Sequence, residues 1–188
     1  MIIKMDLLIR FFLYNKSMEK KYYYDEYNSP LGKIYLLSDG EHLTGLYFEN
    51  QKYFPNLEGI QKRKIEVMNQ TKKYLKEYFD GKHPKIEIPI EIKGTLFGQE
   101  VYEELRKIPY GELRTYKDIS KEIVRKRNIN SMSTQAVGTA IGKNPISILI
   151  PCHRVVGTGN KLTGYAGGLD RKLALLEIEG HKKEMFKE

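Results

Sequence analysis

The residue best suited to covalent chemistry is Cys152, the only cysteine of this 188-residue chain. His153 follows it directly. A free thiol has a pKa of about 8.5 and is mostly protonated at neutral pH, so a nucleophilic cysteine needs a base beside it. The pair therefore predicts a thiol nucleophile that is activated by a histidine. On these two residues alone, a buried structural cysteine stays open as the alternative, because a lone cysteine commonly serves as a small hydrophobic side chain.

Glu179 is a candidate third member of such a site. Helical spacing predicts a helix over 170–179, and a carboxylate in the last turn of a helix is disfavoured by the helix dipole. We therefore expect a partner that compensates for it. A carboxylate that orients a histidine, which in turn activates a thiol, follows the logic of catalytic triads. The alternative is an ordinary solvated glutamate.

Composition limits the surroundings and the partners of this thiol. One cysteine excludes an internal disulfide and leaves too few thiols for the usual structural zinc site, which indicates a reducing, cytoplasmic location. The chain has 32 Lys and Arg against 24 Asp and Glu, a net charge of +8 and a pI near 9.3. This excess favours a polyanionic partner such as nucleic acid. Many Lys-rich and Glu-rich proteins are simply well solvated, so charge alone does not decide.

The first residues of the chain are apolar but do not have the pattern of a targeting or membrane segment. The run MIIKMDLLIRFFLY includes Lys4, Asp6 and Arg10, lacks the cleavage site of a signal peptide and is too short to span a membrane. We expect residues 1–17 to be an N-terminal extension, because Met18 directly precedes the first strand pattern. No association with a membrane is expected.

The first half of the chain has the pattern of a scaffold. Three antiparallel strands are predicted within 22–48, separated by turns at 29–32 and 39–40. A helix is predicted over 64–79, and strict alternation of isoleucines over 86–92 predicts a strand, which Pro89 restricts to a sheet edge. No cluster of catalytic residue types occurs here. We assign 18–93 to an α/β scaffold domain.

The second half, 94–188, is predicted to be helical and to contain a helix-turn-helix candidate. After a helix over 97–105, Thr115 and Asp118 form a capping box that opens a second helix. Ser133 caps a third helix that ends at Gly142. The second and third helices form a helix-turn-helix candidate, joined by the basic stretch 125–127. Small residues in the third helix permit close approach either to a DNA groove or to another helix, and they do not separate the two.

A buried strand is predicted over 145–150, leading directly into Cys152. Its run NPISILIPCHRVV resembles the active-site signature of the O6-alkylguanine-DNA alkyltransferases. Three further runs match that family in the same order: PYGELRTYKDIS, AVGTAIGKN and TGYAGGLDRKLALLEIEG. The run SPLGKIYLLSDG in the first half matches more loosely.

The resemblance implies an α+β fold with a ribonuclease-H-like N-terminal α/β scaffold and a helical, winged-helix-like C-terminal domain. It implies a DNA-repair protein that flips O6-alkylguanine out of double-stranded DNA and transfers the alkyl group irreversibly to Cys152, once per molecule. The protein is expected to act as a monomer without a metal or organic cofactor. Whether it also accepts O4-alkylthymine stays open.

The resemblance also implies roles for individual residues. Beside the acceptor Cys152, it makes His153 the base, acting through a water, and Glu179 the carboxylate that orients it. Asn144 braces the turn before the active site, and Tyr116 donates to guanine N3. The expected substrate-binding residues are Ile141, Val155, Tyr165, Ala166 and Gly167, and the expected DNA-binding residues are Ser133, Thr134, Gln135, Ala136, Gly138 and Arg154.

One residue departs from the family pattern. Gln135 stands where the family normally has an arginine that fills the space left by the flipped base. Glutamine is shorter and uncharged, so we expect it to offset less of the cost of extruding a base.

Three other classes of protein are alternatives. A non-catalytic lesion-binding relative would lack the cysteine, which is present. A helix-turn-helix regulator with a structural thiol would not react with O6-benzylguanine. A cysteine hydrolase is less consistent with the sequence, because no second histidine with an Asn or Asp partner is placed to serve Cys152.

Overall fold

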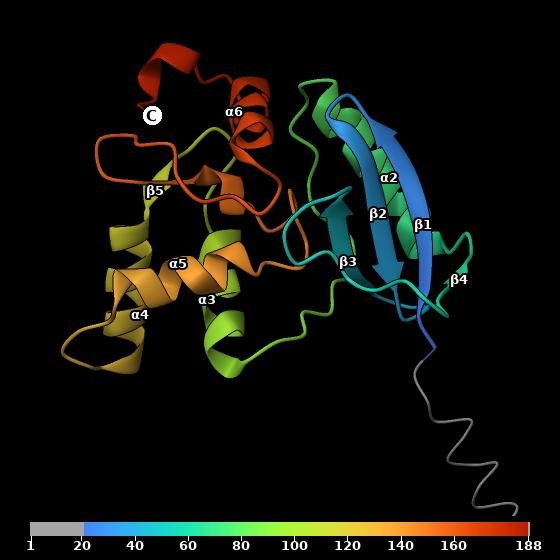
Figure 1. Ribbon diagram of the computed structural model, residues 1–188, viewed down its shortest axis with the longest axis horizontal. Helices are drawn as coiled ribbons and strands as arrows, with labels where there is room; N and C mark the ends of the chain where they lie inside the picture. Colours follow the sequence, from blue (N-terminus) through green and yellow to red (C-terminus); the bar gives the residue numbers. More distant parts are fainter. Residues whose placement is uncertain (1–20, 188) are drawn as a thin grey trace, which may run out of the picture.

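The computed structural model describes residues 21–187, which form a sheet with one helix beside a group of helices (Figure 1). This arrangement confirms the expected α+β fold. The predicted extension, 1–17, lies outside the described residues. Within 21–187, no helix is long and apolar enough to cross a membrane.

The N-terminal part is a four-stranded sheet with strand order β3-β2-β1-β4. The three predicted antiparallel strands are confirmed, while the short β4, parallel to β1, was not predicted. Helix α2 begins and ends close to its predicted bounds. The elements are β1 (Tyr23–Ser29), β2 (Gly32–Ser38), β3 (Leu43–Phe48), β4 (Gln61–Lys62) and α2 (Glu66–Phe79).

The strand predicted over 86–92 is wrong. Only Ile90 pairs, in an isolated parallel bridge with Leu43 of β3. Pro89 has no N–H to donate, although its carbonyl accepts from Leu43 N at 2.8 Å, and Glu91 N donates to Leu43 O at 3.1 Å. The segment therefore does lie at the edge of the sheet, but its pairing is limited to these two hydrogen bonds.

The C-terminal part consists of four α-helices and a short parallel pair, β5 and β6. The capping box of Thr115 and Asp118 is confirmed at the start of α4, and Ser133 accepts from Ala136 N at 3.3 Å to cap α5. The elements are α3 (Leu96–Arg106), β5 (Arg114–Thr115), α4 (Tyr116–Arg127), α5 (Thr134–Gly142), the 3-10 helix η1 (Cys152–Arg154), β6 (Val155–Val156), α6 (Leu169–Ile178) and the 3-10 helix η2 (Lys183–Met185).

The basic stretch 125–127 is not a turn, as the sequence suggested, but the last turn of α4. Basic side chains are favoured at a helix C-terminus by the dipole. Each one also pairs with a glutamate of α3 or α4, so these charges are partly neutralised within the protein. The pairs are Arg125 with Glu122 at 2.8 Å, Lys126 with Glu103 at 2.6 Å and Arg127 with Glu100 at 2.7 Å.

The strand predicted over 145–150 is also wrong, although these residues are buried as expected. Ile148 has a φ of +69°, in the left-handed region, which turns the chain and is incompatible with a strand. Only Ile146 pairs, in a bridge with Leu46 of β3. A short apolar run shows burial but does not distinguish a strand from a tightly turned segment.

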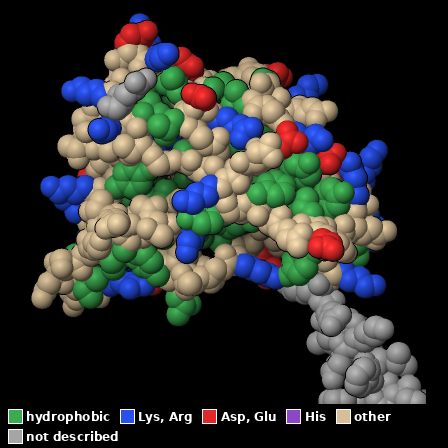
Figure 2. Space-filling model, viewed as in Figure 1, with side chains coloured by type: hydrophobic (Ala, Val, Ile, Leu, Met, Phe, Trp, Pro, Cys, Tyr) green, Lys and Arg blue, Asp and Glu red, His purple; other side chains and the backbone are tan. Residues whose placement is uncertain are grey.

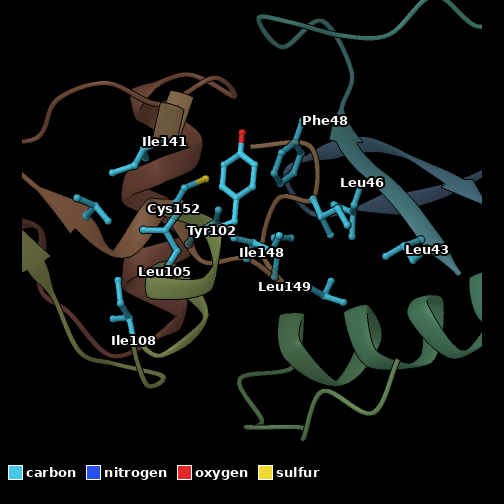
Figure 3. Packing of buried hydrophobic residues seen from close by; sticks show 14 of the residues in the cluster. Leu43, Leu46, Phe48, Tyr102, Leu105, Ile108, Ile141, Ile148, Leu149 and Cys152 are labelled. Atoms are coloured by element: carbon cyan, nitrogen blue, oxygen red, sulfur yellow. The ribbon is translucent and has the colours of Figure 1, made fainter. Parts of the chain in front are cut away.

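This turned segment lies between the two parts of the molecule. Ile148 and Leu149 stand between the sheet residues and the helical residues around Cys152 (Figure 3). Leu46 N donates to Pro145 O at 2.9 Å, and Ser147 N donates to Leu46 O at 3.0 Å. The two parts therefore share one continuous hydrophobic core.

Candidate active site

A pocket of about 620 Å³ opens where the two parts meet. Its walls are the segment Lys52 and Tyr53, the start of α4, one side of α5, and the loop that precedes α6. Among residues 21–187, those that line it include Lys52 and Lys117 but no Asp or Glu. On the face shown in Figure 2, Lys and Arg are otherwise spread over the surface and interspersed with Asp and Glu. The pocket thus combines tyrosine rings and small residues with two lysines, which suits a base and its phosphates.

Cys152 begins η1, is 4% exposed and is not one of the residues that line the pocket. Asn144 Nδ2 donates to its Sγ at 3.0 Å. Burial raises the pKa of the Cys152 thiol, and the hydrogen bond from Asn144 opposes only part of that increase. At neutral pH the resting side chain is therefore a thiol, and its reaction requires a base.

Asn144 also holds the turn that carries the cysteine. Its Nδ2 donates to Ile150 O at 2.7 Å, and its Oδ1 accepts from Ile146 N at 3.0 Å. One buried side chain thus connects both ends of the turned segment to the sulfur. The resemblance implies a bracing role for Asn144, and these are the contacts that such a role would use.

His153 is completely buried. Its Nε2 lies 2.8 Å from Glu179 Oε1, while no group among residues 21–187 forms a hydrogen bond with its Nδ1. Burial lowers the pKa of His153, although the Glu179 carboxylate opposes this. The imidazole is therefore neutral at neutral pH and can accept a proton.

Glu179 directly follows α6, at the helix C-cap. The carboxylate is buried, yet its pKa is lowered, because hydrogen bonds and charge from His153 and Arg154 outweigh the cost of burial. The compensation expected for a carboxylate at a helix C-terminus is thus present. Glu179 accepts from His153, from Arg154 Nε and Nη2 at 2.8 and 2.9 Å, from Tyr78 Oη at 2.8 Å and from Gly111 N at 3.2 Å.

The assignment of Arg154 to DNA contact is wrong. The residue is 7% exposed, and its guanidinium makes a two-pronged contact with Glu179 while Nη1 donates to Ile108 O at 2.6 Å. A buried, paired guanidinium cannot reach a phosphate in solution. Arg154 instead neutralises Glu179.

Tyr116, the first residue of α4, lines the pocket with its ring. Its hydroxyl donates to the carbonyls of Thr163 and Gly164, each at 3.0 Å. Gly138 of α5 faces this ring, and a Cβ there would lie 3.6 Å away, an ordinary contact. Packing between the helices therefore does not require glycine at this position. A larger side chain on Gly138 would instead take up space in the pocket that this residue lines.

The loop before α6 forms another wall of the pocket through Tyr165 and Ala166. Ala166 O accepts from Lys52 N at 2.9 Å, and Gly167 O accepts from Arg171 Nη1 at 3.2 Å. A Cβ on Gly167 would lie 2.7 Å from the Tyr165 ring, so glycine is required there. Contacts from both parts of the molecule hold this loop.

Not all predicted binding residues meet in the pocket. Thr134, Gln135 and Gly138 line it, whereas Ser133 and Ala136 are exposed outside it. Ile141 is buried in the core near Cys152 (Figure 3). Val155 is also buried, and its carbonyl accepts from Lys172 Nζ at 2.5 Å. One carbonyl lone pair remains available there.

Two residues of this region were missed in the sequence. Lys172 is fully buried, donates to Val155 O and to Thr163 O at 2.6 Å, and has its pKa lowered by burial to about 8. It precedes Leu175 and Leu176 by three and four residues, so its place on the apolar face of α6 could have been recognised. Tyr78 lies on α2 in the N-terminal part, and no pattern in the sequence connects it with Glu179. Among residues 21–187, no group of His, Cys, Asp and Glu has the arrangement of a metal site.

Comparison with known proteins matches both parts of the chain to one family. Residues 22–92 match the ribonuclease-like domain, and residues 96–181 match the DNA binding domain, of 6-O-methylguanine DNA methyltransferase. The methylated-DNA–protein-cysteine methyltransferase of Haemophilus influenzae is 40% identical over 84% of this chain and 86% of that protein. That of Methanosarcina acetivorans is 39% identical over 84% and 98%.

Solved structures agree with this match. The O6-methylguanine methyltransferase of Mycobacterium tuberculosis is 38% identical, with a TM-score of 0.73 over 84% of this chain and 92% of that one. A structure of the same organism's OGT in complex with DNA is 37% identical, with a TM-score of 0.74 over 84% and 93%. The chain described here belongs to the 6-O-methylguanine DNA methyltransferase family.

Proposed function

We propose that this protein repairs O6-alkylguanine in double-stranded DNA by moving the alkyl group onto Cys152. The observation that carries the proposal is the buried set of Asn144, Cys152, His153 and Glu179 beside a pocket lined by two lysines. Family relatives named as methylated-DNA–protein-cysteine methyltransferases support it. The substrate is DNA rather than a free nucleotide, because the pocket continues onto the exposed surface of α5.

The chemical step is a displacement at the alkyl carbon. The Cys152 sulfur forms a bond to this carbon as the bond from the carbon to guanine O6 breaks. The thiol proton passes through a water to His153, whose Nδ1 forms no hydrogen bond within residues 21–187. The guanine anion that departs takes up a proton at N1 from solvent, which restores guanine in the DNA. Glu179 stays ionised and stabilises the imidazolium that forms. Because the product is a thioether without a good leaving group, each molecule acts once.

The remaining pocket residues are assigned to binding of the flipped base. Tyr116 would turn its hydroxyl hydrogen from the carbonyls of Thr163 and Gly164 toward guanine N3, which helps guanine leave. Tyr165 and Ala166 would cover the base, and Gln135 would occupy the space it leaves in the duplex. The exposed positions of Ser133 and Ala136 support contact with the DNA backbone.

We also infer a division into a scaffold, 18–93, and an alkyl-acceptor domain, 94–188. The matched family segments, which end at 92 and begin at 96, support this boundary. We infer a cytoplasmic location, since the acceptor is a free thiol. We also infer a monomer, which the resemblance to the family implies. Acceptance of O4-alkylthymine is a further proposal for the same pocket.

Mass spectrometry after incubation with duplex DNA containing O6-methylguanine tests the function. We expect one added methyl group on the peptide that contains Cys152, and restored guanine in the DNA. Unmethylated duplex is the control and should leave the peptide unchanged. An unmodified Cys152 after complete binding of the damaged duplex would favour a helix-turn-helix regulator with a structural thiol.

A further inference from the structure

The N-terminal part contributes one side chain to the buried network around Glu179. Tyr78, in the last turn of α2, is completely buried. Its hydroxyl donates to Glu179 Oε1 at 2.8 Å and lies 3.5 Å from His153 Nε2. The same carboxylate oxygen therefore contacts both the tyrosine and the histidine. A residue of the sheet domain thus reaches the group that orients the base.

Aromatic packing determines where this hydroxyl lies. The Tyr78 ring stacks on Tyr74 at 6.3 Å and meets the rings of Phe79 and Tyr110 edge-on at 5.5 and 6.0 Å. These rings come from α2 and from the segment before β5, so they leave the side chain little freedom. The hydroxyl is consequently held against Glu179 before any substrate arrives.

We propose that Tyr78 is a positioning residue for alkyl transfer, which holds Glu179 Oε1 against His153 and limits how strongly this pair attracts a proton. The inference rests on the proposed function, because it concerns the base of that reaction. A hydrogen bond to a charged oxygen in a buried site is strong, and its donor draws electron density away from the other partner of the same oxygen.

The direction of the effect on the base follows from this sharing. When the Tyr78 hydroxyl is removed, Oε1 interacts more strongly with His153 and stabilises the imidazolium. The pKa of His153 then rises, so the rate should begin to fall at a higher pH as the solution is acidified. The charged and titratable groups that face this pair from the surrounding elements are Cys152 and Arg154 on η1, Lys172 on α6, Tyr74 on α2, Tyr110 before β5 and Tyr165 in the pocket loop. All of these groups stay the same when the Tyr78 hydroxyl is removed, so they do not account for a shift of the acid limb.

The test is Tyr78→Phe, which keeps the ring and its packing. We expect transfer at the plateau of the pH–rate profile to be about tenfold slower, both with methylated duplex and with free O6-benzylguanine. The acid limb of the profile should move to higher pH. Tyr74→Phe is the matched control, since it removes a neighbouring hydroxyl on the same helix α2 that does not bond to Glu179. This control should change neither property.

Replacing Tyr78 with 3-fluorotyrosine tests the same idea without losing the hydroxyl. This analogue is a stronger hydrogen-bond donor of nearly the same shape, so the acid limb should move to lower pH. Acid limbs that superimpose for all three proteins, or an equal loss of rate at every pH, would overturn the proposal. If the wild-type protein transfers no alkyl group, the proposed function fails, and the role of Tyr78 fails with it. If the wild type is active but the acid limb of the pH–rate profile is unmoved in both variants, only the role of Tyr78 is overturned.

Discussion

The buried network around Glu179 and the exposed surface of α5 meet the same substrate in opposite ways. In the network, both carboxylate oxygens accept hydrogen bonds from within the protein, and Asn144 bonds to the sulfur itself. On α5, Thr134, Gln135 and Ala136 point into solvent. The chemical machinery is therefore assembled before DNA arrives, whereas the DNA-reading surface is completed only by DNA. Substitutions in the two regions should consequently affect different measurements.

Cys152→Ala should give the largest effect. Without the sulfur no bond to the alkyl carbon can form, so transfer is abolished, while affinity for alkylated duplex stays close to that of the wild type because it comes from phosphate contacts and the pocket. Mass spectrometry and a binding titration measure the two properties separately. Residual transfer in this variant would remove Cys152 from the mechanism.

Glu179→Gln and His153→Ala should slow transfer by about 10² to 10⁴, the usual contribution of a general base. In the wild type the rate should be flat near neutral pH and fall as the pH drops through the pKa of His153, which lies below its ordinary value of about 6.5. Glu179→Gln removes the charge that raises this pKa, so the acid limb should move to lower pH. His153→Ala should instead give a rate that rises with pH as the thiolate forms.

These profiles are measured with free O6-benzylguanine, so that DNA binding does not enter. The control is the wild-type profile with the same reagent. Unchanged pH dependence in both variants would show that the network does not serve as the base. The buried network would then not differ from the surface of α5 in its contribution to the chemical step.

Arg154→Ala sharpens the comparison, because this arginine was expected at the DNA-binding surface and lies in the buried network around Glu179. Its removal leaves the buried Glu179 short of its charged partner and should lower the free energy of unfolding by about 3 kcal/mol. Arg125→Ala, which breaks an exposed ion pair with Glu122, should cost less than about 1 kcal/mol. Denaturant unfolding compares the two, and equal losses would contradict the buried role.

Gln135→Arg should accelerate repair of duplex DNA several-fold and leave the reaction with free O6-benzylguanine unchanged. Extrusion of a base costs a few kcal/mol, and a longer, charged side chain fills the vacated space better than glutamine does. Parallel rate measurements with the two substrates isolate the flipping step. Equal changes in both reactions would mean that Gln135 does not act on flipping.

Lys117→Ala should have the smallest effect. Lys117 is exposed and lines the pocket, and loss of one phosphate contact reduces the slope of log affinity against log salt by about 1. Lys33→Ala on β2, outside the pocket, changes the net charge equally and serves as the control. Identical salt slopes for the two variants would argue against a phosphate contact at Lys117.

The sequence predicted elements best where local chemistry determines them. Thr115 with Asp118, and Ser133, cap their helices as expected, since capping depends on residues three positions apart. The strands over 86–92 and 145–150 failed because apolar patterns report burial and say little about hydrogen-bond partners. Pro89 limits pairing in one segment, and the positive φ of Ile148 turns the other.

In the site, the residues of the CHRVV run and Asn144 lie together because few residues separate them. Arg154 was misassigned, because the sequence shows its position beside His153 but not the direction of its side chain. Tyr78 could not be found at all, since 101 residues separate it from Glu179 and only the packing of α2 brings the two together.

The turned segment 145–150 has a consequence for how the protein unfolds. It is hydrogen-bonded to β3 on one side and leads into the cysteine on the other, and its side chains belong to a core that both domains share. Neither domain can open without exposing part of the core of its neighbour. The two should therefore melt in a single cooperative transition, and damage to the sheet should weaken the active site as much as damage close to it.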